Sequence, residues 1–138
     1  MALRIGRTLL GISFAMAGCT PMPSEPQVKD FPGLPRSRIC SNGLVRSIGG
    51  TQEAPMTMNN DGGWCWNRWF DTRGVGVVFA PSLRVTTPPA NGQLDIVRGE
   101  NRTRVAYKPN LGFVGEDRFT LFHVEINADQ PHVVTVTK

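Results

Sequence analysis

The stretch from Tyr107 to Phe119 constrains the fold of this chain more than any other part, because it predicts a strand, a tight turn and a second strand. Apolar and polar residues alternate on both sides of the turn, which is typical of half-buried strands. Pro109 has no N–H group to donate and is expected to end the first strand. Gly112 and Gly115 stand where a tight connection requires a positive φ. Asp117 ends the turn, where we expect its carboxylate to accept hydrogen bonds from turn amides.

This stretch resembles the signature of bacterial immunoglobulin-like and cadherin-like modules, Tyr-x-Pro-x-x-Gly-Phe-x-Gly-x-Asp-x-Phe. Within it, Phe113 is the one aromatic residue of the turn and is expected to fold back onto the core. A second stretch, Thr86 to Leu94, resembles the Pro-x-x-Gly-x-Leu opening of the same modules. The resemblance covers roughly Ser82 to Thr137 and implies an immunoglobulin-like sandwich in an exported protein. It implies little about function, because sandwiches of this kind have many roles.

The rest of the chain predicts further short strands and no helix after the first eighteen residues. Fifteen glycines and eleven prolines favour turns over long helices. Short apolar runs recur at roughly ten-residue spacing, which predicts an all-β fold. We therefore expect a single immunoglobulin-like antiparallel β-sandwich of about seven strands over residues 39–138. We assign residues 39–80 to the same sandwich because about 55 residues alone would make a marginal core.

Residues 1–18 read as an export signal. Arg4 and Arg7 precede an apolar run that is too short to span a bilayer. The next residues, Met16-Ala17-Gly18-Cys19, resemble the lipobox of bacterial lipoproteins. In that family the chain is cut before the cysteine, so the resemblance implies a lipid such as palmitate on Cys19. The alternative is an ordinary secretory signal cut near Ala17.

Residues 19–38 are expected to form a tether between the lipidated cysteine and the sandwich. The segment is rich in proline and in polar residues, so it should stay extended and solvated. A polyproline-like spacer of this length reaches roughly 50 Å. The alternative is a disordered tail with no spacing role. Thr20 differs from the aspartate that usually retains such lipoproteins in the inner membrane, which favours the outer membrane, facing the periplasm.

The chain has three cysteines, and an odd number in an exported protein requires an explanation. If Cys19 carries lipid, Cys40 and Cys65 are left to form a disulfide in the oxidising periplasm. Such a bond would stabilise the fold by about 3 kcal/mol. The alternative is two free thiols.

Three tryptophans lie close together in the predicted strand that contains Cys65. Alternation places Trp64 and Trp66 on one face of that strand and Cys65 on the other. Aromatic side chains stack on sugar rings, so the cluster could bind peptidoglycan. Packing in the core beside a disulfide is the competing interpretation, and the one we favoured. Trp69 is out of phase with the pair and was expected to be the most exposed of the three.

Metal, cofactor and nucleic-acid sites are not expected. His123, Glu125, Asp129 and His132 lie near the last hairpin, but two histidines are too few for a zinc site, and residues 127–131 read as a turn. The family resemblance offers Glu116 and Asp117 as calcium ligands, but a single module lacks the neighbouring repeat that completes the site. The net charge of +4 falls to +2 once the leader is removed, which is too small to indicate nucleic-acid binding.

No nucleophile elbow, Cys–His pair or Gly-rich phosphate loop occurs in the sequence, so we expect no enzyme activity. The predicted function is non-catalytic: a membrane-anchored envelope lipoprotein whose sandwich provides protein–protein interaction or structural support. Another envelope protein is the expected partner. One alternative is a peptidoglycan-binding or glycan-binding module that uses Trp64, Trp66 and Trp69. A second is a periplasmic inhibitor of a lytic enzyme or protease, which would present the loop from Asn59 to Gly63.

Overall fold

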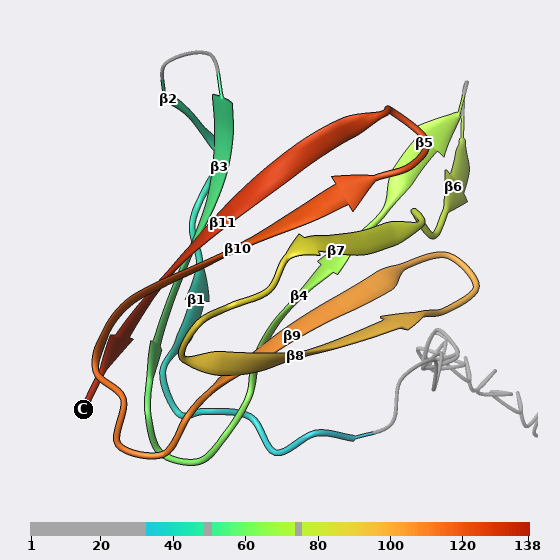
Figure 1. Ribbon diagram of the computed structural model, residues 1–138. Helices are drawn as coiled ribbons and strands as arrows, with labels where there is room; N and C mark the ends of the chain where they lie inside the picture. Colours follow the sequence, from blue (N-terminus) through green and yellow to red (C-terminus); the bar gives the residue numbers. More distant parts are fainter. Residues whose placement is uncertain (1–32, 49–50, 74–75) are drawn as a thin grey trace, which may run out of the picture.

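The computed structural model describes residues 33–48, 51–73 and 76–138, and this part of the chain is built from strands alone (Figure 1). The expected all-β fold is therefore confirmed. The signal segment, Cys19 and most of the tether lie outside the described residues. Among the residues described, no helix is long and apolar enough to cross a membrane.

Eleven strands are present in the described residues, against about seven expected. They are β1 (Cys40–Asn42), β2 (Arg46–Ile48), β3 (Thr51–Asn59), β4 (Cys65–Trp69), β5 (Asp71–Arg73), β6 (Val77–Phe79), β7 (Leu83–Thr87), β8 (Gly92–Arg98), β9 (Thr103–Pro109), β10 (Gly115–His123) and β11 (Ala128–Thr137). The surplus consists of three-residue strands: β1 and β2 both pair with β3, and β5 pairs with β6. The other seven strands form the sandwich.

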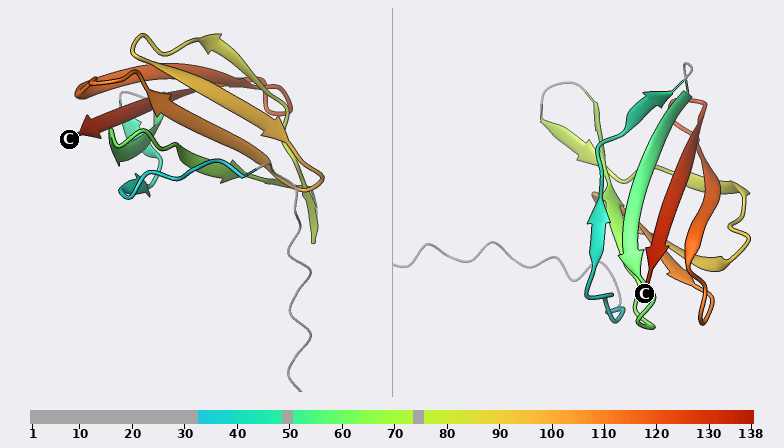
Figure 2. Two further views of the ribbon diagram at one scale, coloured as in Figure 1. Left: turned by 90° about the horizontal axis from the view of Figure 1, so that it is seen from below. Right: turned by 90° about the vertical axis from the view of Figure 1, so that its left-hand side faces the viewer.

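Two sheets form the two layers of the molecule (Figures 1 and 2). The larger has the order β1-β3-β11-β10-β7, and the smaller has the order β4-β9-β8. The seven longer strands can be counted along the chain from β3. The second, fifth and fourth of them (β4, β9 and β8) form the smaller sheet, and the third, sixth and seventh (β7, β10 and β11) lie in the larger sheet. Immunoglobulin-type sandwiches divide their strands in this way. The first of the seven, β3, joins the larger sheet and runs parallel to β11, so the pairing is not antiparallel throughout.

Residues before Pro81 contribute one long strand to each sheet. In β3, the segment from Ala54 to Asn59 pairs with the last strand of the chain. In β4, each residue from Cys65 to Trp69 pairs with a residue of β9. This segment is therefore part of the same sandwich and does not merely pack against it.

The core lies between the two sheets and follows the period-two pattern of the strands. It is a cluster of buried side chains from β3, β4, β9, β10 and β11: Met56, Met58, Cys65, Val105, Tyr107, Phe119, Leu121, Val134 and Val136. Successive residues of a strand point to opposite faces. Core residues from one strand are therefore two positions apart. Cys40 and Cys65 form the expected disulfide, with 5.2 Å between their Cα atoms, and it joins β1 of the larger sheet to β4 of the smaller.

The turn between β9 and β10 is built as the sequence predicts. Gly112 and Gly115 have φ values of 77° and 139°, and Phe113 packs against the core cluster. Asp117 is buried and accepts hydrogen bonds from the backbone N–H groups of Ala90 and Asn91, at 3.0 and 2.9 Å. Its carboxylate therefore fixes the chain that leads from β7 into β8. The amides expected to donate to it were those of its own turn, but the donors belong to this other connection.

Tyr107 also pairs with the buried Asp117 carboxylate, through its side chain. Its hydroxyl donates to Asp117 Oδ2 at 2.9 Å. Burial, together with this hydrogen bond, raises the pKa of Tyr107 above its ordinary value. The tyrosine ring also lies directly against the backbone of Gly92, where a Cβ atom would overlap it. Tyr107, Asp117 and Gly92 all belong to the two stretches that resemble the module signature. Through these contacts they form one packed unit at this end of the sandwich.

Two local predictions need correction. Residues 127–131 were read as a turn, but the turn ends at Asn127, which has a φ of 50°, and β11 begins at Ala128. Pro131 is tolerated in β11 because β3 joins that strand only from His132 onward. The tether also meets the domain earlier than residue 39: Trp64 N–H donates to the carbonyl of Pro35, and Ser37 N–H donates to the carbonyl of Trp64.

Candidate functional site

The three tryptophans do not form one surface. Trp64 and Trp66 lie on the outer face of β4, half-buried, with Lys108 Nζ 5.8 Å from the Trp64 ring and the Arg36 guanidinium 5.1 Å from the Trp66 ring. Trp69 lies on the inner face, where it packs against the core cluster. We expected Trp69 to be the most exposed of the three; all three are half-buried, and strand alternation gives Trp69 the same side as Cys65.

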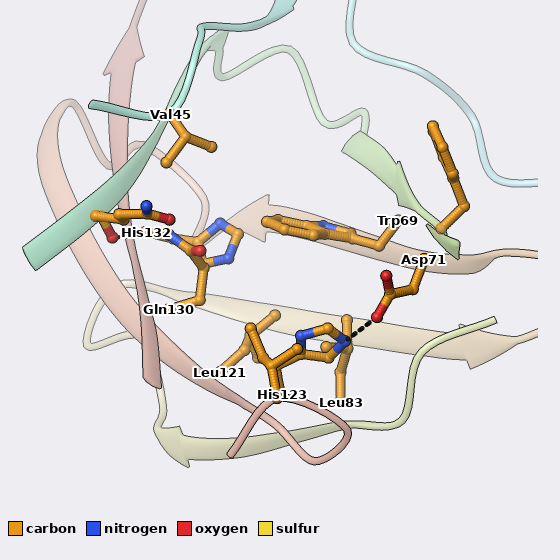
Figure 3. A pocket seen from close by; sticks show the side chains of 11 residues that line it. Val45, Trp69, Asp71, Leu83, Leu121, His123, Gln130 and His132 are labelled. Carbon is orange, nitrogen blue, oxygen red and sulfur yellow. Dashed lines mark hydrogen bonds and ion pairs between the residues drawn. The ribbon is translucent and has the colours of Figure 1, made fainter. Parts of the chain in front are cut away.

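A pocket of about 280 Å³ opens at the end of the sandwich opposite the Tyr107–Asp117 unit (Figure 3). It is formed where β4 ends, β5 and β7 begin, and the β10–β11 hairpin turns. Its lining comprises Val45, Gln52, Trp69, Phe70, Asp71, Leu83, Leu121, His123, Ile126, Gln130 and His132. Residues that are almost ninety positions apart in sequence thus share one wall.

His132 stands in the wall of the pocket between two aromatic rings. Its ring stacks on Phe119, with 4.4 Å between centroids and 11° between planes, and meets Trp69 edge-on at 5.5 Å. Burial lowers the pKa of His132 to about 4. The imidazole is therefore neutral near pH 7, which suits its apolar surroundings.

His123 faces two carboxylates on the other side of the pocket, of which Figure 3 shows that of Asp71. Its Nε2 lies 3.9 Å from Asp71 Oδ2 and 3.5 Å from Glu125 Oε2. Both oxygens of Glu125 also accept a hydrogen bond from the backbone N–H of Ser82 at 2.9 Å. Burial raises the pKa of Glu125, but the Ser82 hydrogen bonds outweigh it, and the net shift is downward.

The four residues considered as metal ligands are not brought together. His123 and Glu125 are neighbours, but Asp129 lies near the Thr86 hydroxyl, which donates to it at 3.3 Å, and His132 is stacked in the pocket wall. No group of three or more histidine, cysteine, aspartate or glutamate side chains within the described ranges is placed to hold a metal ion.

Three side-chain nitrogens of this pocket are buried without a hydrogen-bond partner among the described residues. They are Trp69 Nε1, His123 Nε2 and His132 Nε2, and all three residues line the pocket. Figure 3 shows their rings around the same space. His123 Nε2 still has the two carboxylates as ion-pair neighbours. Buried polar groups are usually paired, so the nitrogens of Trp69 and His132 are the exceptions that mark this pocket as the candidate site.

The rim of the pocket is apolar and exposed. Val45, Phe70 and Ile126 are 46%, 58% and 60% exposed, and each also lines the pocket. Large apolar side chains gathered on one surface mark interaction sites in soluble domains. The site thus combines an apolar mouth with polar groups in its wall, as ligand pockets do.

Sequence reasoning found Trp69, His123 and His132 but did not place them together. It missed Phe70, Asp71 and the apolar rim altogether. One sequence signal could have placed Trp69 correctly. It is four residues after Cys65, an even number, so the two side chains point to the same face of the strand.

No protein family, no curated protein and no solved structure matches this chain with significance. The site must therefore be interpreted from its own geometry.

Proposed function

We propose that this protein is a lipid-anchored envelope protein, held in a membrane through Cys19, whose sandwich domain is a non-catalytic module for binding another envelope protein. The proposal takes the lipobox resemblance as the anchor and places the binding face at the pocket. The protein would face the periplasm from the outer membrane, with residues 19–34 as a spacer.

The disulfide supports export, because such bonds persist in oxidising compartments. Cys40 and Cys65 are joined between the two sheets, so the bond belongs to the fold itself. The contacts of Pro35 and Ser37 with Trp64, the residue before β4, support the tether, because they fix the end of the spacer to the domain.

The observation that carries the binding function is the exposed apolar rim formed by Val45, Phe70 and Ile126. A partner that covers this rim would remove apolar surface from water, which drives most protein association. Among the described residues, the lining of the pocket includes no serine, threonine or cysteine that could act as a nucleophile, which favours binding over catalysis.

The glycan alternative is restricted to Trp64 and Trp66, because Trp69 lies on the opposite face of β4. Cations already lie against both rings, which favours a structural role for them. The inhibitor alternative needs a projecting loop at residues 59–63. Here Asn60 Nδ2 donates to the carbonyls of Asn110 and Phe113, which holds the loop against its own domain.

Two measurements test the proposal. The anchor predicts that the mature protein isolated from cells has an N-terminal Cys19 with fatty acyl mass, and that Cys19→Ala protein leaves the membrane fraction. An N-terminus without acyl mass contradicts it. The binding function predicts one stoichiometric protein partner after cross-linking in intact envelopes. If purified peptidoglycan retains this protein and no protein partner is captured, glycan binding becomes the favoured function over protein binding.

A further inference from the structure

The walls of the pocket contain unsatisfied polar groups that a ligand can pair. Trp69 Nε1 can only donate a hydrogen bond, whereas the neutral imidazole of His132 donates from one nitrogen and accepts at the other. Leaving such groups buried without partners is costly. A ligand hydroxyl that reaches both nitrogens serves both, because a hydroxyl oxygen accepts from Trp69 Nε1 and its hydrogen donates to His132 Nε2.

The size and the remaining walls of the pocket fit one ring. An apolar cavity of about 150 Å³ holds benzene, so the pocket of about 280 Å³ has room for a substituted ring. Leu83 and Leu121 offer apolar contact, and the rings of Trp69 and His132 offer edges and faces for aromatic packing. A single ring with one polar substituent fills such a space.

The charges beside the pocket select against an anion. Asp71 lines the pocket, and Glu125 lies 3.5 Å from the pocket residue His123. A ligand carboxylate or phosphate would enter near these two acidic groups. A phenol is uncharged at neutral pH, since its pKa is about 10.

We propose that the pocket receives the side chain of a tyrosine presented by a protein partner. This rests on the proposed function and names the group that is recognised. The exposed rim indicates that the tyrosine belongs to a protein and is not a free phenol. Val45, Phe70 and Ile126 lie exposed around the mouth, and a free phenol inside the pocket would leave them in water. Residues beside a partner's tyrosine cover them.

Binding requires a small movement of the wall. The nitrogens of Trp69, His123 and His132 are fully buried in this conformation, so the ring reaches them by shifting the side chains in front of them. The indole N–H of Trp69 therefore changes its environment when the site fills, which gives a direct signal.

The test is a titration of full-length protein in detergent micelles, with 15N-labelled tryptophan followed by NMR. The three indole signals are assigned with Trp64→Phe, Trp66→Phe and Trp69→Phe. The probes are acetyl-Gly-Tyr-Gly-amide, acetyl-Gly-Phe-Gly-amide and p-cresol. We expect the tyrosine peptide to move the Trp69 signal and to bind about three- to ten-fold more tightly than the phenylalanine peptide.

Trp66→Phe is the matched control, since it changes the outer face of the same strand and must keep this preference. Trp69→Phe must abolish it, with the two remaining indole signals showing that the variant is folded. Equal binding of the two peptides to the unaltered protein, or no change at Trp69, overturns the proposal. Binding of p-cresol as tight as that of the tyrosine peptide overturns the partner source. A partner captured in envelopes without any tyrosine preference refutes this inference and leaves the proposed function standing.

Discussion

Removing the buried carboxylate of Asp117 should destabilise the sandwich more than any other single change to a charged side chain near this turn. The residue is 3% exposed and accepts hydrogen bonds from Ala90 N–H, Asn91 N–H and the Tyr107 hydroxyl. Each buried donor left unpaired costs about 1–3 kcal/mol. The two amides are only partly buried, so water can reach them, and we expect Asp117→Ala to cost about 4 kcal/mol.

A double-mutant cycle isolates the contact between Tyr107 and Asp117. Tyr107→Phe alone removes one hydrogen bond to a charged group and should cost about 2 kcal/mol. In the Asp117→Ala background the hydroxyl has lost its charged acceptor and keeps only the longer contact of 3.4 Å with the Asn91 carbonyl, so the same change should cost well under 1 kcal/mol. The coupling energy between the two sites is then about 2 kcal/mol.

Urea unfolding, extrapolated linearly to water, measures all four proteins. The control is Glu116→Ala, which removes the neighbouring carboxylate. That group is 53% exposed and, within the described part of the chain, forms its ion pair with Arg118, so its loss should cost well under 1 kcal/mol. The reasoning is refuted if Asp117→Ala costs no more than Glu116→Ala, or if Tyr107→Phe costs the same in both backgrounds.

Three further predictions concern the pocket, the disulfide and Gly92. Burial holds the pKa of His132 at about 4, below its ordinary 6.5. The unfolded chain therefore binds the proton first as the pH falls, and the free energy of unfolding should decrease by about 3 kcal/mol between pH 7 and pH 4. His132→Phe should lack this decrease, and parallel curves of stability against pH for the two proteins would contradict it. Replacing Cys40 and Cys65 together by alanine should lower the free energy of unfolding by about 3 kcal/mol, and an unchanged urea midpoint would show that the bond adds nothing. Gly92→Ala places a Cβ against the Tyr107 ring and should cost about 2 kcal/mol, whereas Gly33→Ala, with nothing within 4 Å, should be neutral; equal effects would sink the packing argument.

The predictable part of the fold depends on local chemistry. The β9–β10 turn follows from Gly112 and Gly115, because its positive φ values favour glycine, whereas the partners of Asp117 in the β7–β8 connection could not be read from local sequence. The Cys40–Cys65 bond follows from counting cysteines once Cys19 is assigned to lipid. Both were expected from the sequence, and the structure contains both.

The pocket could not be predicted because its residues are separated in sequence and depend on strand order. Trp69 meets His132 only because β4 and β11 lie in facing sheets. The direction of Trp69 was missed because its parity was compared with the other tryptophans and not with Cys65. The turn at residues 127–131 was misplaced because Asn127 alone adopts the positive φ, so the hairpin closes earlier than the turn-forming residues suggest.

Site-specific photo-cross-linking in living cells tests the central claim most directly, namely that the pocket end of the sandwich binds a protein partner. A benzophenone amino acid replaces Phe70, which is 58% exposed at the rim, or Leu111, which is 99% exposed at the opposite end. We expect one protein adduct from position 70 and none from position 111. Adducts from position 111 alone, or from neither position, would contradict the claim.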